Sequence, residues 1–170
     1  LFISAFVGGI MDKGSIQIYY GEGQGKTSAA LGNAIRKASN GQTAYVVQFM
    51  KGQLDTEYLK RLEPEVKVFR FERCSEGFDA LDEEEKQEQK QNIQNGLNFA
   101  KKALVTGQCD MLVLDEVLGL VKEDMATEDQ IIEILQAKSL YTDVVLTGRD
   151  VLPRVFEMAD SILKIVPEKV

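Results

Sequence analysis

The sequence predicts a single α/β domain in which a mostly parallel sheet of about six strands carries helices on both faces. Short apolar runs of the kind that form buried strands alternate along the chain with longer segments of helical periodicity. The length of 170 residues suits one domain with its own core. A glycine-rich segment also joins the first predicted strand directly to the first predicted helix, as expected for a strand–loop–helix unit.

The predicted strands are short runs rich in apolar side chains. They cover residues 15–20, 43–50, 66–71, 111–115 and 143–147, with a weaker sixth candidate at 161–166. Ligands of such parallel sheets bind at the C-terminal ends of the strands. We therefore expect the functional site where these runs end.

Periodicity and capping residues define the predicted helices. Apolar side chains recur at helical spacing from Ala30 to Ala38, and Asn40-Gly41 ends that helix. A long helix is expected from about Asp82 to Thr106, with a capping box at its start and an acidic first turn. Its apolar stripe consists of Ile93, Leu97, Ala100 and Leu104.

Two shorter helices follow. Thr127 and Gln130 form the capping pattern of a helix that carries Ile131, Ile134 and Leu135. Pro153 suits the first turn of a last helix, where a missing N–H is tolerated.

The segment from Gly21 to Ser28, GEGQGKTS, is typical of a phosphate-binding loop. Its three glycines let backbone N–H groups turn inward around an oligophosphate, and the following helix presents its positive N-terminal end. Lys26 adds a positive charge, and Thr27 supplies the hydroxyl expected on a phosphate-bound Mg²⁺.

The loop departs from the usual pattern of glycine, four residues and Gly-Lys-Ser/Thr. Counting back from Gly25 puts Tyr20 where the first glycine should stand, so the loop is one residue shorter. Strand, glycine turn, Lys-Thr and helix still occur in the required order. The alternative is a glycine-rich turn that binds nothing.

Composition limits the classes of function. The net charge of −7 and isoelectric point near 4.8 argue against a nucleic-acid surface and favour a small-molecule substrate. The sequence has no histidine, which excludes serine–histidine and cysteine–histidine nucleophiles and imidazole metal sites. Cys74 and Cys109 lack Cys-x-x-Cys partners, and we expect free thiols in a reducing cytoplasm.

The first ten residues are apolar, but they are too few to span a membrane and have no basic flank or cleavage signature. Met11 followed by Asp-Lys-Gly has the form of a natural start. We therefore expect residues 1–10 to be a non-native or flexible segment and residues 11–170 to form the domain. A flap or a partner contact is the alternative.

Residues 111–116, MLVLDE, are four apolar residues followed by two carboxylates, the form of a metal-holding strand in phosphate-loop proteins. Asp115 or Glu116, together with Thr27, would help to hold Mg²⁺ directly or through water. An apolar strand ending in Asp-Glu is often only a strand that meets solvent, and this is the alternative.

Arg149 follows the fifth predicted strand in Thr147-Gly148-Arg149-Asp150 and so falls on the same edge of the sheet. Its guanidinium could contact a phosphate or a substrate carboxylate through two hydrogen bonds. A glycine turn with a structural Arg149–Asp150 pair is the alternative.

Four segments together resemble the ATP:corrinoid adenosyltransferases of the phosphate-loop type. They are YGEGQGKTSAALG at 20–32, VQFMKG at 47–52, VLDEV at 113–117 and LTGRD at 146–150. The resemblance runs from about Ile16 to Ile165, and the shortened loop is itself a mark of that family. It implies a RecA-like phosphate-loop NTPase architecture.

The resemblance implies transfer of the 5′-deoxyadenosyl group from ATP to the Co(I) centre of a reduced corrinoid, with release of triphosphate. Co(I) is then the nucleophile and the ribose C5′ the electrophile. No protein base is required, in agreement with the missing histidine. The family binds ATP in reversed orientation on the loop.

The resemblance also implies roles for single residues. The implied nucleotide contacts are Gly21, Glu22, Gly23, Gln24, Gly25, Lys26, Thr27, Ser28, Arg36 and Arg149. Mg²⁺ is expected on Thr27 and on Asp115 or Glu116. The expected catalytic residues are Lys26, Thr27, Phe78 and Glu116.

Two positions depart from the family pattern. Gln24 stands where most relatives have lysine, so one positive contact to the triphosphate is missing. Many relatives place a tryptophan shortly after the phenylalanine that corresponds to Phe78, whereas this chain has no tryptophan. In that family these aromatics lie against the corrin and help to remove the lower axial cobalt ligand, so only Phe78 is carried over.

The expected partners are ATP, a corrinoid, an electron donor such as a flavoprotein and a second copy of the chain in a homodimer, with no nucleic acid or membrane. One alternative is an ordinary NTPase or small-molecule kinase in which Glu116 polarises water or a substrate hydroxyl. Triphosphate as the product would indicate the transferase, whereas diphosphate or phosphate would indicate the NTPase or kinase. Another is a non-enzymatic switch whose nucleotide state controls a protein partner.

Overall fold

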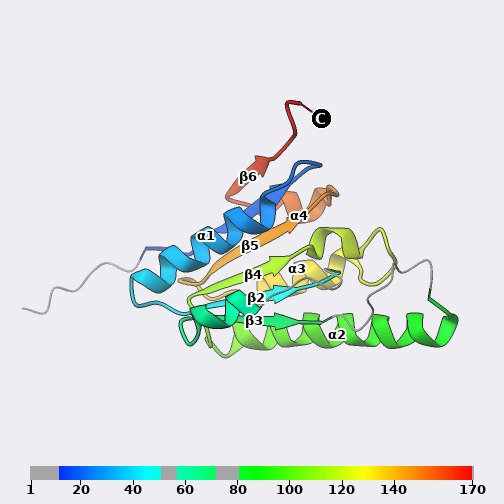
Figure 1. Cartoon of the computed structure of the whole chain (residues 1–170), viewed down its shortest axis with the longest axis horizontal. Helices are drawn as coiled ribbons and strands as arrows, with labels where there is room; N and C mark the ends of the chain where they lie inside the picture. The colour runs from blue at the N-terminus through cyan, green and yellow to red at the C-terminus, as the bar shows by residue number, and fades with distance from the viewer. Residues whose placement is uncertain (1–11, 51–56, 72–80, 170) are drawn as a thin grey trace, which may run out of the picture.

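The computed structural model describes residues 12–50, 57–71 and 81–169. Six strands within these ranges form one parallel sheet in the order β3-β2-β4-β5-β1-β6. Figure 1 shows the sheet with β3 at one edge and β6 at the other. They are β1 (Ile16–Tyr20), β2 (Ala44–Gln48), β3 (Val66–Arg70), β4 (Met111–Asp115), β5 (Asp143–Gly148) and β6 (Ser161–Lys164). The predicted sheet is confirmed, including its weakest candidate strand.

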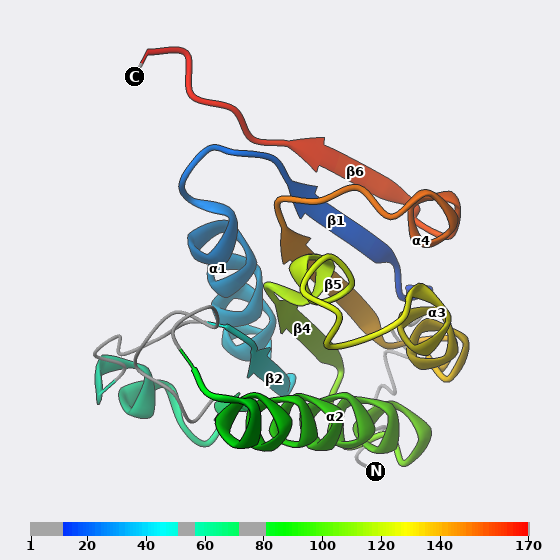
Figure 2. The same ribbon diagram turned by 90° about the vertical axis from the view of Figure 1, so that its right-hand side faces the viewer.

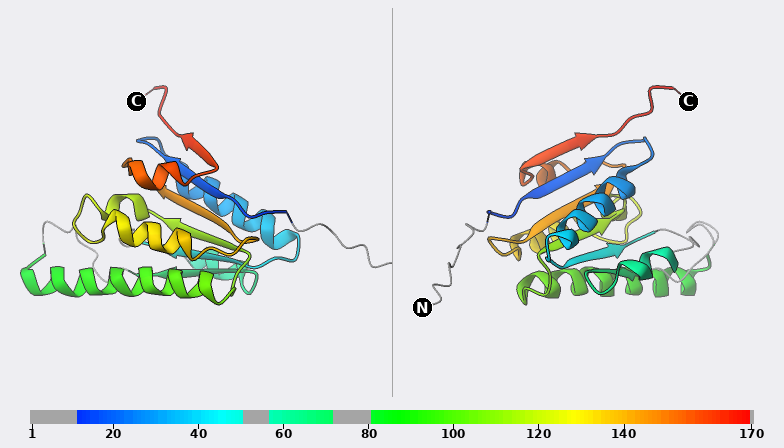
Figure 3. Two further views of the ribbon diagram at one scale, coloured as in Figure 1. Left: turned by 180° about the vertical axis from the view of Figure 1, so that it is seen from behind. Right: turned by 60° about the vertical axis from the view of Figure 1, so that its left-hand side comes forward.

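Helices cover both faces of the sheet. They are α1 (Lys26–Ser39), α2 (Glu83–Val105), α3 (Glu128–Gln136) and α4 (Pro153–Glu157), with 3₁₀ helices η1 (Glu57–Leu62) and η3 (Val117–Leu120). α1 lies on one face, and α2, α3 and α4 lie on the other (Figures 2 and 3). Neither of these 3₁₀ helices was predicted, because segments of six and four residues are too short to show a helical periodicity.

The predicted caps set the starts of α2 and α3. The Asp82 carboxylate accepts a hydrogen bond from the Glu85 N–H at 2.8 Å, and the Glu85 carboxylate accepts one from the Asp82 N–H at 2.9 Å. Thr127 and Gln130 form the same reciprocal pair at α3. These bonds satisfy N–H groups that a helix start leaves without internal partners.

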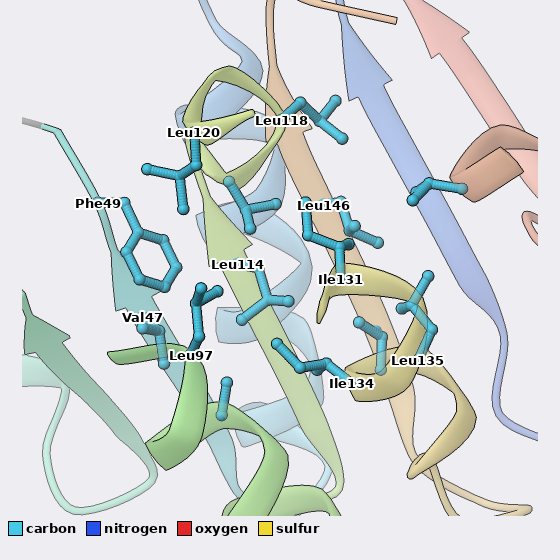
Figure 4. Packing of buried hydrophobic residues seen from close by; sticks show 14 of the residues in the cluster. Val47, Phe49, Leu97, Leu114, Leu118, Leu120, Ile131, Ile134, Leu135 and Leu146 are labelled. Atoms are coloured by element: carbon cyan, nitrogen blue, oxygen red, sulfur yellow. The ribbon is translucent and has the colours of Figure 1, made fainter. Parts of the chain in front are cut away.

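The core has one layer on each face of the sheet. In the layer under α2 and α3, apolar side chains of both helices interdigitate with those of the central strands (Figure 4), including Val47, Leu97, Leu114, Ile131, Ile134, Leu135 and Leu146. On the opposite face, Ala30 and Ala34 of α1 are fully buried against Val46, Val113 and Val145. These alanines let α1 lie close to the sheet.

The topology fixes where the site forms. β4 and β5 lie between β1 and β2, so the chain crosses two strands as it passes from β1 through α1 to β2. The loop before α1 therefore lies at the C-terminal edge of the sheet, beside the ends of β4 and β5.

No helix in the described part of the chain is long and apolar enough to cross a membrane. Residues 1–10, for which a non-native or flexible segment is expected, lie outside the described residues.

Candidate functional site

The segment after β1 turns sharply and leads directly into α1. Gly21 and Gly25 have φ values of 113° and 101°, a region that other L residues rarely adopt. Gly25 is the N-cap of α1, and no side chain caps the helix. The first N–H groups of a helix have no acceptor within it, so this helix start is suited to an anion.

Two of the three loop glycines pack against neighbouring backbone. The Gly21 N–H donates to the Gly148 carbonyl at 3.2 Å, and the Gly23 N–H donates to the Ile165 carbonyl at 2.9 Å. A Cβ on Gly21 would lie 2.5 Å from the Ile165 carbonyl oxygen. These two N–H groups are therefore bound to neighbouring segments, which differs from the expectation that all three glycines turn theirs inward.

Lys26 is buried inside the loop, with 6% of its surface exposed. Its ammonium donates to the carbonyl oxygens of Gly21 at 2.6 Å and Gly23 at 2.7 Å. Burial of an ammonium group is costly unless such acceptors compensate for the lost water. The loop thus holds a desolvated positive charge beside the start of α1.

Asp115 is the centre of a polar cluster under the loop. Its carboxylate is fully buried and, within the described part of the chain, accepts hydrogen bonds from three side chains on three different elements. The Oδ1 atom accepts from Thr147 Oγ1 of β5 at 2.6 Å and from Thr27 Oγ1 of α1 at 2.9 Å, and Oδ2 accepts from Gln48 Nε2 of β2 at 3.2 Å. Of the two carboxylates left open by the sequence, Asp115 is the one that binds Thr27.

Glu116 takes a different direction. Its φ of 64° is left-handed, and its N–H donates to Thr147 Oγ1 at 2.9 Å. With Met50, Gly119, Lys122, Glu123, Arg149 and Asp150 it lines a cavity of about 370 Å³. This volume lies within the usual range for small-molecule sites.

The donor set at Asp115 fits a magnesium ion. Mg²⁺ is usually bound through one or two carboxylates, with substrate phosphates and waters completing its shell. The Asp115 carboxylate and the Thr27 hydroxyl supply hard oxygen ligands at the loop. Among the described residues no cluster of three acidic, cysteine or histidine side chains could hold a metal, so a cation here would depend on phosphate oxygens and water.

Arg149 lies beside the loop at the surface. Its Nη1 atom is 3.7 Å from Glu22 Oε2, whereas Asp150 pairs with Lys122 at 3.8 Å. The structure thus brings Arg149 to the phosphate loop and gives it a partner other than Asp150. An exposed pair of this kind adds little stability, so the Arg149 side chain is available to a ligand.

Arg36 is not brought to the loop. It lies ten positions after Lys26 in the same helix, which separates the two by about 15 Å. Its guanidinium donates to Asn33 Oδ1 at 2.7 Å and lines a second cavity, of about 290 Å³, with Asp143 at the start of β5. Its predicted contact with the nucleotide gains no support from this placement.

Three of the remaining predicted site residues lie at the surface of the loop or of the helix start. Ser28 lies exposed in the first turn of α1, and Glu22 and Gln24 are exposed in the loop. Phe78 lies outside the described residues.

Sequence reasoning assigned no role to Gln48 or Thr147. Both residues were part of the segments that carry the resemblance, and each is a polar residue at or near the end of an apolar strand. That position was the available signal, because strand ends meet at the site in a parallel sheet.

Comparison with known proteins decides the family. The model of the family described as ATP:corrinoid adenosyltransferase BtuR/CobO/CobP matches residues 12–170. The chain belongs to this family. The corrinoid adenosyltransferases of Escherichia coli K12 and Salmonella typhimurium LT2 are each 29% identical to it over 158 residues, which cover 93% of this chain and 79% of theirs.

Two solved structures with a similar fold are more distant in sequence from this adenosyltransferase family member. The flagellar accessory protein FlaH of Methanocaldococcus jannaschii matches with a TM-score of 0.60 and 13% identity, covering 92% of this chain and 73% of FlaH. A KaiC-like protein of Pyrococcus horikoshii OT3 matches with the same score and identity over 94% of this chain and 76% of its own. These matches confirm the predicted fold, a single α/β domain with a parallel sheet.

Proposed function

We propose that this adenosyltransferase family member transfers the 5′-deoxyadenosyl group of ATP to the Co(I) centre of a corrinoid and releases triphosphate. The observation that carries the proposal is the pairing of a buried Lys26 in the loop with the Thr27–Asp115 hydrogen bond beneath it. The family match over residues 12–170 supports the choice of ATP and a corrinoid as substrates.

The reaction needs stabilisation of a leaving group more than it needs a base. The cobalt–carbon bond forms as the bond between C5′ and the phosphate oxygen breaks, and the electron pair of that bond leaves with triphosphate. The two electrons of the new bond come from Co(I), which becomes Co(III). Lys26 and the N-terminus of α1 lie where they would stabilise the charge that develops on the triphosphate.

Thr27 and Asp115 would hold the magnesium ion of the nucleotide. When bound, Mg²⁺ neutralises part of the phosphate charge and fixes the orientation of the triphosphate. Thr147 and Gln48 hold the Asp115 carboxylate in place by hydrogen bonds to both of its oxygens. The protein thus contributes a fixed carboxylate that does not have to reorganise as the triphosphate leaves.

The cavity lined by Glu116 and Arg149 is our candidate for the adenosyl group. The cavity is lined by Glu116, which follows Asp115, and by Arg149, which pairs with Glu22 of the loop. It therefore adjoins the phosphate site on the side of β4 and β5. Glu116 would accept hydrogen bonds from the ribose hydroxyls there, and Arg149 would contact the phosphates.

We place the reaction in the cytoplasm, with a flavoprotein as the electron donor, because Co(I) must be supplied by reduction. We also propose that the chain acts as a homodimer. Ile162 and Leu163 of the edge strand β6 are 43% and 52% exposed, which supports an interface there.

The direct test combines the protein with ATP, Mg²⁺ and chemically reduced cobalamin. The visible spectrum of a light-sensitive cobalt–carbon product and an equal amount of triphosphate are expected. Diphosphate or phosphate as the product would instead indicate an ordinary NTPase or kinase. ATP binding without turnover, with Co(I) present, would indicate a switch.

The corrinoid half of the proposal rests on Phe78, because the chain has no tryptophan to share its role. A single aromatic should shield the lower face of cobalt incompletely and leave Co(II) harder to reduce. Phe78→Ala is expected to depress the reaction that starts from Co(II) while it spares the reaction with Co(I) and the affinity for ATP. Equal losses in both assays, or none, would remove Phe78 from the corrinoid site.

A further inference from the structure

Gln48 ends β2 directly opposite Asp115 of β4 in the sheet register. Its side chain lies on the face covered by α1, as Ala44 and Val46 do, because alternate residues of a strand share a face. Only 5% of its surface is exposed. A buried amide therefore stands beside the carboxylate that binds Thr27.

The hydrogen bond to Asp115 fixes the orientation of this amide. A carboxylate can only accept hydrogen bonds, so the NH₂ group of Gln48 must face Asp115 Oδ2, at 3.2 Å. The carbonyl oxygen Oε1 is then turned away from Asp115. Of the buried side-chain nitrogen and oxygen atoms in the described part of the chain, it is the one that has no hydrogen-bond partner. A buried oxygen that accepts no hydrogen bond is energetically unfavourable, so we expect Oε1 to receive a hydrogen bond from a bound ligand or water.

The chemistry around Asp115 indicates which donor is missing. Asp115 Oδ1 binds Thr27 and Thr147, and Oδ2 faces Gln48, so Gln48 lies across the carboxylate from Thr147. A magnesium ion at Thr27 and Asp115 keeps several of its waters, and each of these waters is a strong, polarised donor. Gln48 stands beside Asp115 at the strand ends, where such a hydrated ion would lie, so a metal-bound water is a suitable donor for Oε1.

We propose that Gln48 is an outer-sphere ligand of the nucleotide's magnesium ion, with Oε1 accepting a hydrogen bond from a metal-bound water while Nε2 holds Asp115. This inference rests on the proposed function, since it deepens the metal site described there. A neutral amide suits this place because it can donate to one neighbour and accept from the other. A glutamate at position 48 would keep the acceptor and lose the donor.

The experiment measures metal binding by the full chain in the presence of ATP, with Mn²⁺ as the probe. Free Mn²⁺ is followed by electron paramagnetic resonance, and the water proton relaxation rate reports the waters that remain on the bound ion. In Gln48→Met the Mn²⁺ dissociation constant is expected to rise about tenfold or more, because the variant loses both the acceptor for the metal-bound water and the donor to Asp115. ATP binding without metal should not change.

Two further variants make the result specific. Gln48→Glu keeps an acceptor oxygen but loses the donor to Asp115, so it should bind Mn²⁺ more tightly than Gln48→Met does. Thr147→Val removes the shorter hydrogen bond to Asp115 and leaves Oε1 in place, so it should weaken Mn²⁺ binding less than Gln48→Met does. Circular dichroism and urea unfolding check that all three variants fold.

The outcomes separate the two proposals. Wild-type Mn²⁺ affinity in Gln48→Met, or equal losses in Gln48→Met and Thr147→Val, would overturn the role of Oε1 even if the wild type forms the cobalt–carbon product. Mn²⁺ binding by Gln48→Glu that is no tighter than binding by Gln48→Met would also overturn it. Loss of the adenosylation product in the wild-type assay would overturn the proposed function itself.

Discussion

Thr27 and Asp115 are 88 positions apart in the sequence, yet the Thr27 hydroxyl donates to Asp115 Oδ1 at 2.9 Å. This hydrogen bond joins the start of α1 to the end of β4. It brings the hydroxyl of the phosphate loop and a fully buried carboxylate to one point at the C-terminal edge of the sheet. The arrangement predicts unequal roles for the two neighbouring acids.

Asp115→Asn is expected to raise the Mg²⁺ requirement of the reaction about tenfold or more, because an amide is a poor ligand and can no longer accept all three hydrogen bonds. Glu116→Gln is the matched control, since it makes the same chemical change one residue later. It should alter the KM for ATP or corrinoid and leave the Mg²⁺ titration nearly unchanged. If both variants titrate like the wild type, the carboxylate pair is only structural.

Lys26→Ala should reduce ATP affinity about 10- to 100-fold, because it removes a desolvated charge from the phosphate loop. Lys102→Ala, in the exposed last turn of α2, removes the same charge far from the site and is the control. Isothermal titration with ATP measures both. Near-wild-type affinity and turnover in Lys26→Ala would contradict the assignment of the loop.

The fold could be predicted because its determinants are local. Apolar runs marked each strand, and the Asp82–Glu85 and Thr127–Gln130 capping pairs marked the helix starts to the residue. Local patterns do not contain the strand order. The contact between Gln48 and Asp115 exists because β2 and β4 are neighbours, which no single segment reveals.

The arrangement of the site depends on the same non-local information. The resemblance alone predicts Arg36 near the nucleotide, and this stays a prediction, since ten residues of helix separate Arg36 from Lys26. The left-handed turn at Glu116 could not be predicted either, since nothing in Asp-Glu requires it. That turn is what sends the two adjacent carboxylates to different places.

Two glycine-to-alanine changes test the packing of the helices on the sheet. A Cβ at Gly96 of α2 would lie 2.7 Å from both Phe49 Cε1 and Phe71 Cγ, so Gly96→Ala should lower the free energy of unfolding by about 1–3 kcal/mol. Gly32 of α1 has open space around it, and Gly32→Ala should raise stability by about 0.5–1 kcal/mol. Urea unfolding measures both, and the same sign in the two variants would contradict this packing.

Asp143, at the start of β5, predicts a pH dependence of stability. Its Oδ1 atom accepts hydrogen bonds from Ser15 N at 2.7 Å and Ser15 Oγ at 3.0 Å, and its Oδ2 atom pairs with Lys37 at 2.5 Å. Burial acts to raise the pKa of this carboxyl, but the Lys37 ammonium and the Ser15 donors outweigh it and hold the pKa below its ordinary value.

Because the folded-state pKa is depressed, this carboxylate stabilises the fold at every pH above the unfolded-state pKa, about 3.9, and the contribution is lost as pH falls through the folded value. Asp143→Asn should therefore cost about 2 kcal/mol at pH 7, and the difference from the wild type should shrink below about pH 4. Asp129→Asn is the control, because the Asp129–Arg154 pair is largely exposed and should contribute under about 1 kcal/mol. Urea unfolding between neutral and acid pH gives both curves. A deficit in Asp143→Asn that stays constant down to the most acid pH would show that the side chain acts through packing and not through its charge.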